Sequence, residues 1–309
     1  MVFDIDPRKP TGGLALKIYK RIDFWMLQHL RALRLKFCFA RYPHHIEIDV
    51  PPSEGISRDD VMVFTAADSV YLGRFLGPFV GSMVAHVPSP RLHVHLYNPN
   101  GGDFALLKSV QQQYPAMQLT WSHETFSADE FARRANASPR QMWKSLYICC
   151  SRFLAARTLQ KQTGASLLII DIDILFNGNI RERFTDDIAC ALLLRPDESN
   201  LSKRTLGGVV FASASPVGQA FLSRACDYIE RFLAAGFYWF AFDQYALFRA
   251  VQAMSEKERF NQFSPLTQRD VSFEFAKDAL ILFAKGTLKD EEEYSNLAGR
   301  YAEKRGEVS

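Results

Sequence analysis

The sequence predicts an α/β fold in which helices flank a mostly parallel central sheet. From Val61 onward, short apolar runs typical of strands alternate with longer segments typical of helices. This alternation indicates a parallel sheet covered on both faces. One run, Leu167–Ile170, contains no polar residue, as expected for a strand that is buried on both sides. With 309 residues, 48% of them hydrophobic, the chain can bury the large core that such a fold needs.

The individual elements follow from apolar runs of strand length, apolar periodicity and turn residues. The expected strands are Val61–Thr65, Leu92–Tyr97, Met117–Trp121, Leu167–Ile170, Ala189–Leu194, Gly208–Ala212 and Leu280–Phe283. Asp68 can cap the first helix, which we expect to end near Ala85, and the Asn-Pro-Asn-Gly-Gly turn at 98–102 ends the second strand. The further expected helices are Leu106–Gln112, Gln141–Gln162, Val217–Ala234 and Asp243–Met254.

Residues 1–57 have a different character and are expected to form an N-terminal extension to a main domain at 58–309. The extension contains a basic amphipathic helix at about Leu14–Phe39 and a short extended piece, Ile46–Val50. Between positions 14 and 41 there are seven Lys and Arg residues and one acid, a local excess of 7 − 1 = +6. Such a helix either docks on an anionic membrane, where lipid-linked acceptors lie, or packs on the main domain with its charges in water.

Composition excludes several classes of protein. The net charge of +3 is too small to indicate a nucleic-acid partner. The five cysteines form no CxxC pair, which favours a reducing compartment, and we expect Cys149 and Cys150 to be core residues. The first ten residues lack the apolar region of a signal peptide, and no run of 18 apolar residues occurs. We therefore expect a cytoplasmic protein, with peripheral contact at the inner face of the membrane as an option.

The most specific chemical signal is Asp171-Ile172-Asp173, directly after the apolar strand at 167–170. Ligands bind at the carboxyl ends of strands in open α/β sheets. Two carboxylates placed together there are costly unless a cation neutralises them. A hard divalent ion with oxygen ligands suits this pair, and phosphate oxygens suit its remaining positions. The alternative is that the two acids merely end a strand and cap a turn.

Several weaker patterns accompany this motif in a fixed order along the chain. Together with the motif, the order is Val63–Leu72, Leu92–Leu96, Lys144–Tyr147 with Ser151–Leu154, Asp171–Asp173, Gly207–Phe211, Phe242–Leu247 and Lys285–Lys289. In this order, from about Val61 to Lys289, the chain resembles the GT-A nucleotide-diphospho-sugar transferases. The similarity is greatest to the retaining, glycosyltransferase family 8-like branch, which includes glycogenin and bacterial lipopolysaccharide galactosyl- and glucosyltransferases.

The resemblance implies a hexosyltransferase of the GT-A fold that moves a sugar from a UDP-sugar to a glycan, lipid-linked or protein acceptor. It implies a divalent metal, Mn²⁺ or Mg²⁺, bound by Asp171 and Asp173. The residues implied to bind the donor are Thr65, Ala66, Ala67, Tyr71, Arg152, Asp171, Lys285, Gly286 and Lys289. Asp243 and Gln244 are the implied catalytic residues beside the sugar.

Each of these roles has a structural alternative. Asp243 could be a helix N-cap. Arg152, on an apolar helix face, needs an anionic partner: the donor phosphates or Asp171 would serve, and the alternative is a partner elsewhere in the fold. Lys285 and Lys289 could belong to a solvated charged tail, because the acids Asp290–Glu293 follow them. His93 and His95 share one face of a strand, but nothing nearby completes a metal site, so we expect a structural pair.

Two positions depart from the family pattern. Phe283 stands where the family often has a metal-binding His, and Leu206 stands where it usually has an Asn. These departures keep open a catalytically silent relative that binds sugar nucleotide without turnover. A haloacid-dehalogenase-like phosphatase with Asp171 as nucleophile is a further alternative. Two features count against it: about 110 residues of α/β pattern precede the motif, and the later paired acids of that family are missing.

Overall fold

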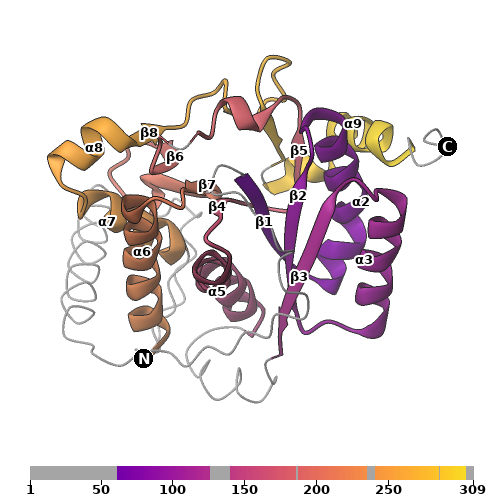
Figure 1. The fold of residues 1–309 in the computed structure, drawn as a ribbon, viewed down its shortest axis with the longest axis horizontal. Helices are drawn as coiled ribbons and strands as arrows, with labels where there is room; N and C mark the ends of the chain where they lie inside the picture. Colours follow the sequence, from indigo (N-terminus) through magenta and orange to yellow (C-terminus); the bar gives the residue numbers. More distant parts are fainter. Residues whose placement is uncertain (1–60, 126–139, 186, 235–240, 285, 304–309) are drawn as a thin grey trace, which may run out of the picture.

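The computed structural model describes residues 61–125, 140–185, 187–234, 241–284 and 286–303. Their main feature is a seven-stranded sheet in the order β3-β2-β1-β4-β7-β6-β8 (Figure 1). Its strands are β1 (Val61–Asp68), β2 (Arg91–Tyr97), β3 (Gln118–Glu124), β4 (Ser166–Ile170), β6 (Cys190–Leu194), β7 (Thr205–Ala212) and β8 (Phe263–Pro265). Only β7 runs against its neighbours β4 and β6, and the other pairings in this sheet are parallel. The predicted mostly parallel sheet is confirmed.

Helices cover both faces of this sheet (Figure 1). The helices are α2 (Ser69–His86), α3 (Gly101–Gln113), α5 (Arg140–Thr163), α6 (Pro216–Ala234), α7 (Phe242–Gln252), α8 (Glu256–Gln262) and α9 (Glu292–Glu303). Alternate residues of β1 enter different cores: Val61 and Val63 pack with residues of α2 and α3, whereas Met62 and Phe64 pack with residues of α5 and α6. Because successive strand residues point to opposite faces, burial on both sides explains the apolar runs.

The predicted helix starts agree with the structure to within one residue, except at α3. The Asp68 carboxylate accepts the Tyr71 backbone N–H at 3.1 Å and so caps α2. At α3, Asn100 and Asp103 form a reciprocal capping box, which begins this helix earlier than the sequence pattern predicted. None of the described helices is both long and apolar enough to cross a bilayer. The predicted N-terminal extension, with its basic helix, lies outside the described residues.

A second, three-stranded sheet was not predicted. It consists of β5 (Ile174–Phe176), β10 (Ile281–Phe283) and β9 (Val271–Ser272), with β10 in the centre. The expected strand at 280–283 therefore exists, but it pairs antiparallel with β5 rather than joining the main sheet. This pairing joins segments about 105 residues apart, which no local pattern reveals. It brings Phe283 opposite Ile174, directly after the Asp171-Ile172-Asp173 motif.

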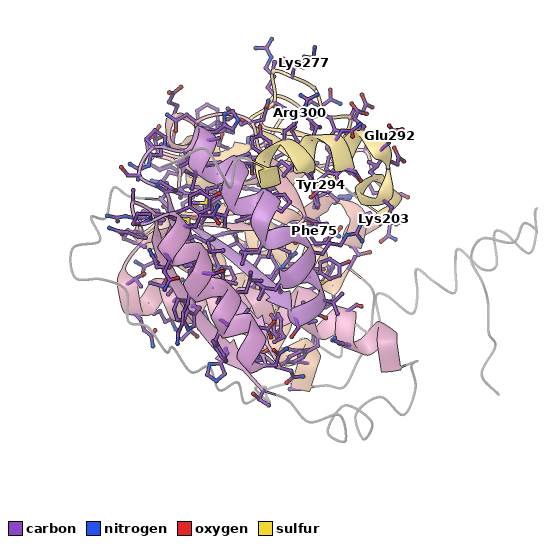
Figure 2. The ribbon with its side chains drawn as sticks, turned by 90° about the vertical axis from the view of Figure 1, so that its right-hand side faces the viewer. Phe75, Lys203, Lys277, Glu292, Tyr294 and Arg300 are labelled. Carbon is purple, nitrogen blue, oxygen red and sulfur yellow. The ribbon has the colours of Figure 1, made fainter. Side chains whose placement is uncertain are left out.

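The acidic segment at 290–293 leads into a packed helix, α9, instead of a charged tail. Figure 2 shows α9 lying along α2, with Tyr294 turned toward Phe75; the centroids of these two rings are 6.3 Å apart. Arg74 pairs with Asp290 at 2.6 Å, and His86 contacts the Tyr301 hydroxyl at 3.0 Å. Acids in the first turn suit the positive end of a helix dipole. The short 3₁₀ turns η1 (Ile180–Glu182), η2 (Leu201–Lys203) and η3 (Gly286–Asp290) complete the described elements.

Candidate active site

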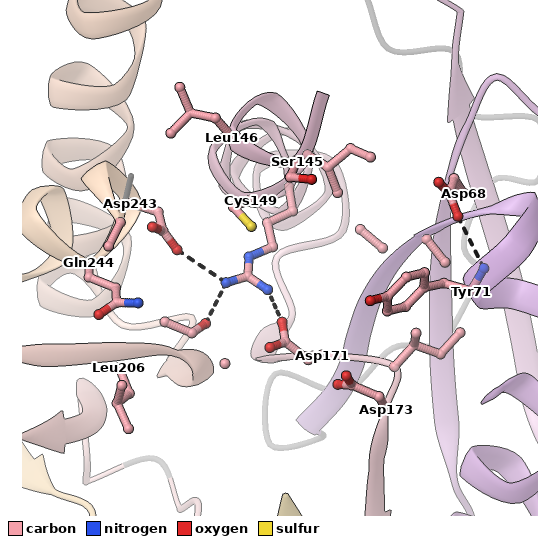
Figure 3. Close-up of a pocket in the computed structure, with 18 of the residues that line it drawn as sticks. Asp68, Tyr71, Ser145, Leu146, Cys149, Asp171, Asp173, Leu206, Asp243 and Gln244 are labelled. Carbon is pink, nitrogen blue, oxygen red and sulfur yellow. Dashed lines mark hydrogen bonds and ion pairs between the residues drawn. The ribbon is translucent and has the colours of Figure 1, made fainter. Parts of the chain in front are cut away.

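A pocket of about 560 Å³ opens where β1 and β4 end at the same edge of the sheet (Figure 3). Its walls come from distant parts of the chain: the end of β1 and the start of α2, the first half of α5, the 171–173 loop, β7, the start of α7 and η3. The carboxyl edge of parallel strands is the usual place for ligands in open α/β sheets. The pocket size is also in the range of small-molecule sites.

Asp171 and Asp173 both line this pocket. The strand before them is buried throughout, and the Asp171 backbone N–H donates to the Gly208 carbonyl at 3.0 Å. The chain then turns to enter β5. Two carboxylates one residue apart are therefore held against one cavity. The motif therefore lies at the carboxyl end of β4, where the sequence predicted it, and its role in binding a metal or ligand stays a prediction.

Arg152 of α5 joins the acids of the pocket. Its side chain is 9% exposed and donates to Asp171, to the Gly207 carbonyl at 2.8 Å and to Asp243 at 3.3 Å (Figure 3). Burial lowers the pKa of this guanidinium, but Asp171 and Asp243 offset that effect and leave the pKa above its usual value. Asp171 is thus an anionic partner of Arg152, as predicted, and Asp243 is a second partner that was not predicted.

Asp243 and Gln244 lie in the first turn of α7 and line the pocket. The predicted alternative that Asp243 is the N-cap is wrong. The capping position is Ala241, which has a left-handed backbone (φ 63°), and Asp243 is already helical with its carboxylate directed to Arg152. Burial raises the pKa of Asp243, and Arg152 opposes that rise only in part. The site therefore holds a carboxylate whose charge is poorly compensated.

The other end of the pocket holds Asp68, Tyr71 and Lys144. Lys144 pairs with Asp68 at 2.7 Å. Burial alone would raise the pKa of Asp68, but Lys144 and the backbone N–H of Tyr71 more than offset it, so the pKa is lowered. Lys144 was absent from the predicted site residues. The available signal was helical spacing, since residues 144, 148 and 152 repeat every four positions and form one face of α5.

Three of the six remaining predicted donor-binding residues also reach the pocket. Ala66, Ala67 and Gly286 line it, and Gly286 has φ +66°, a backbone conformation that glycine adopts without strain. Thr65 does not line it: its side chain is fully buried in β1, which corrects the prediction that it contacts the donor. Lys289 lies in η3, a turn whose Lys289 side chain is not described, and Lys285 lies outside the described residues.

Two cysteines and two histidines were predicted to have structural roles. Cys150 is buried as expected, but Cys149 lines the pocket, which corrects its assignment to the core. Burial raises the pKa of Cys149 to about 12, so its thiol is neutral. His93 and His95 are fully buried, and each bonds the Ser122 hydroxyl at 2.8 Å. The expected structural pair is confirmed.

The pocket depends on two glycines in β7, at an irregularity in its pairing with β6. The register shifts between Leu192 and Leu193, and Gly207 and Gly208 of β7 fall in the interval that this shift skips. A Cβ on Gly208 would lie 2.3 Å from the Phe283 ring and 2.8 Å from an Asp171 oxygen. Phe283 and Asp171 therefore approach the backbone of β7 more closely than any side chain at 208 would allow.

We expect Gly208→Ala to lower the free energy of unfolding by about 1–3 kcal/mol, because the new methyl group overpacks this contact. Adding Phe283→Leu should recover part of the loss by making room. Gly73→Ala is the matched control, since a Cβ at Gly73 meets no atom within 4 Å. Urea unfolding measures all variants. Equal stability of Gly208→Ala and the parent chain would contradict the close approach.

The residues of this pocket fit a divalent cation that arrives with a phosphate ligand. Asp171 and Asp173 offer the carboxylate oxygens that Mg²⁺ and Mn²⁺ accept. Among the described residues, no three His, Cys, Asp or Glu side chains are grouped to hold a metal, and Phe283 offers no ligand atom. Mg²⁺ commonly binds one or two carboxylates and completes its coordination with phosphates and water. A cage made of protein ligands alone does not fit the described residues.

No protein-family model matches the sequence, and no curated protein sequence matches it. The solved structures that it resembles include glycosyltransferases. One is mouse xyloside xylosyltransferase 1 in its apo form, with 11% identity and a TM-score of 0.45 over 74% of this chain and 99% of that one.

Two further structures show a comparable likeness. The apo bifunctional glycosyltransferase WbbM has 11% identity and a TM-score of 0.48, over 82% of this chain and 52% of that one. Galactosyltransferase LgtC, in complex with donor and acceptor sugar analogues, has 13% identity and a TM-score of 0.48, over 77% and 95%. All three TM-scores lie below 0.5.

Proposed function

We propose that this chain is a glycosyltransferase that takes a hexose from a UDP-sugar and passes it to a glycan, lipid-linked or protein acceptor. One observation carries the proposal: distant segments that resemble a transferase motif set converge on one pocket. Along the pocket, Asp68 and Tyr71 lie at one end, Asp171 lies near the middle, and Asp243 and Gln244 lie at the other end (Figure 3). This order suits a base, a diphosphate and a sugar in turn.

The chemistry required is stabilisation of the leaving diphosphate. Asp171 and Asp173 are the residues that would hold a divalent cation, and a cation so placed supplies electrostatic stabilisation of that leaving group. Gly286, which has no Cβ, lets the backbone of η3 approach phosphate oxygens. Arg152 holds Asp171 and Asp243 in position and keeps their charges from repelling each other.

Asp243 and Gln244 are proposed to face the donor sugar. A polar or nucleophilic group on that side can stabilise an oxocarbenium-like centre, and this is the requirement for transfer with retention. The raised pKa of Asp243 means that burial favours loss of its negative charge. A developing positive charge on the sugar would therefore interact favourably with this carboxylate.

Nucleotide binding provides the direct test. In thermal melts with UDP, GDP and CMP, each with and without Mn²⁺, we expect UDP with Mn²⁺ to raise the Tm. A ligand at about 100 times its Kd adds about 2.7 kcal/mol to the stability of the folded state. Asp173→Ala should lose the shift. Asp197→Ala should keep it, because Asp197 is an exposed acid that does not line the pocket.

The other outcomes are equally informative. A shift with UDP alone, unchanged by Mn²⁺, would contradict the metal role of Asp171 and Asp173 while retaining a nucleotide site. A shift with GDP or CMP in place of UDP would change the assigned base. No shift with any of the nucleotides would contradict the transferase proposal.

A further inference from the structure

Gln244 contacts Thr205 twice, once through its backbone and once through its side chain. The Thr205 hydroxyl donates to the backbone carbonyl of Gln244 at 2.7 Å. The backbone carbonyl of Thr205 lies 2.7 Å from one end of the Gln244 side-chain amide, and the Ser202 carbonyl lies 3.1 Å from the same end. Thr205 begins β7 and is fully buried, and Ser202 in η2 is 2% exposed. The first turn of α7 is thus attached to the start of β7 through Thr205.

These contacts determine which way the amide faces. Two carbonyl oxygens at one end of an amide can only be satisfied by its NH₂ group. Nε2 of Gln244 therefore donates to Thr205 and Ser202. Figure 3 draws the opposite orientation, in which oxygen would face oxygen, and it shows the other end of the amide directed into the pocket. That end is the carbonyl oxygen, Oε1.

The turn that supplies the second carbonyl is itself held in place. Asn200 caps η2: its side-chain oxygen accepts the Ser202 backbone N–H at 3.1 Å and the Ser202 hydroxyl at 2.8 Å. Arg204 donates to the Glu198 carbonyl at 2.7 Å. The two carbonyls that receive Nε2 therefore belong to short, locally bonded backbone. Turning the amide over would leave both of them facing an oxygen, which is costly for buried groups.

We propose that Thr205 is a positioning residue that holds Gln244 so that only its Oε1, an acceptor without a proton, faces the sugar end of the pocket. The inference rests on the proposed function. A fixed acceptor at that place receives a hydrogen bond from a sugar hydroxyl, or offers partial negative charge to a positive centre on the sugar. It offers no N–H to the ligand. The substrate group opposite Gln244 is therefore a hydrogen-bond donor or an electron-poor carbon.

The first test is the side-chain amide of Gln244 in the ¹⁵N-labelled full chain. Its NMR signals are identified as the pair that disappears in Gln244→Glu. We expect both protons to exchange slowly with water, because buried carbonyls bind them. Thr205→Val removes the hydroxyl at nearly constant shape, and with it the hydrogen bond to the backbone carbonyl of Gln244. We expect the amide protons to exchange about tenfold faster in this variant, the effect of losing one buried hydrogen bond. Thr205→Ser, which keeps the hydroxyl, should restore slow exchange.

Exchange at the rate of an exposed glutamine in the parent chain would overturn the proposal, as would unchanged exchange in Thr205→Val. This measurement needs no substrate, so it gives an answer even if the chain is not a transferase. If Thr205→Val fails to fold, Thr205→Ala serves as the variant without the hydroxyl, and its comparison with Thr205→Ser decides.

The second test is hydrolysis of the UDP-sugar in the presence of Mn²⁺. We expect Thr205→Val to lower kcat about tenfold, again the effect of one buried hydrogen bond, with the KM for the donor unchanged, and Thr205→Ser to recover it. A rise in KM without a change in kcat would overturn the positioning role. Absence of hydrolysis in the parent chain, with a protected Gln244 amide, would support the positioning role and contradict the proposed function.

Discussion

Arg152→Met should lower the free energy of unfolding by about 3–5 kcal/mol, the cost of leaving buried charges without their partner. Among the residues that the structure describes, Arg152 is the cation that contacts both Asp171 and Asp243. The Asp243 side chain is only 6% exposed. Without Arg152 the two acids repel each other at the edge of the sheet. We therefore also expect loss of the UDP–Mn²⁺ thermal shift. Urea unfolding and thermal melts measure the two effects.

Arg157→Met is the matched control for this variant. Arg157 lies on the same helix, α5, and pairs with Glu230 and Asp227 away from the pocket. Its replacement should destabilise the chain but leave the nucleotide shift intact. Adding Asp243→Asn to Arg152→Met should restore part of the stability, because one of the two uncompensated charges is removed. Nucleotide binding by Arg152→Met as tight as that of the parent chain would contradict the role of Arg152 in the site.

Asp243→Asn should lower donor hydrolysis and transfer at least about 100-fold, within the range for loss of an acid that takes part in the reaction. The same variant should be more stable than the parent chain at neutral pH. Burial dominates the shift of Asp243 and raises its pKa, so the folded protein holds this proton more tightly than the unfolded chain does. The charged form therefore destabilises the folded state, and asparagine carries no such charge.

The stability advantage of Asp243→Asn should depend on pH. Stability of the parent chain falls as pH rises from the unfolded pKa of about 3.9 through the raised folded pKa, because the folded state binds more protons in that window. The advantage of Asp243→Asn should therefore be largest above the folded pKa. It should disappear at pH values below the unfolded pKa.

Asp270→Asn is the control for this second variant. Asp270 is buried and bonded to Arg183 and Thr267, outside the pocket, so its replacement should cost stability without loss of turnover. Transfer by Asp243→Asn at the parent rate would contradict a catalytic role. Lower stability than the parent chain at neutral pH would show that the bond to Arg152 outweighs the cost of burying the charge.

Local pattern was sufficient for most elements of the main sheet and its helices. Apolar runs such as Leu167–Ile170 identified strands, because burial on both faces excludes polar residues. Asp68 identified a helix start, because a capping carboxylate must directly precede the helix. Helix boundaries were less certain where capping depends on backbone geometry: Ala241 caps α7 with a left-handed backbone and offers no side-chain signal.

The candidate site was predictable where its residues stand at the end of a recognisable strand or repeat at helical spacing. Asp171 and Asp173 follow a buried strand, and Arg152 interrupts an apolar helix face. Thr65 was wrongly predicted to contact the donor. Side chains along a strand point alternately to opposite faces, so a shift of one residue separates the pocket wall from the interior. Cys149 was misplaced for a related reason: an apolar helix face borders both the core and the cavity.

The sequence by itself determined the class of the fold, the position of the acidic pair at the end of β4, and the chemistry that such a pair favours, because all three depend on neighbours in the chain. Only the tertiary structure decided that Arg152 bridges Asp171 and Asp243, that Phe283 packs on Gly208, and that Thr205 orients Gln244. Each of these contacts joins residues from separate elements. Their geometry follows from how the sheet and helices pack, and from an irregular strand whose path no local pattern specifies.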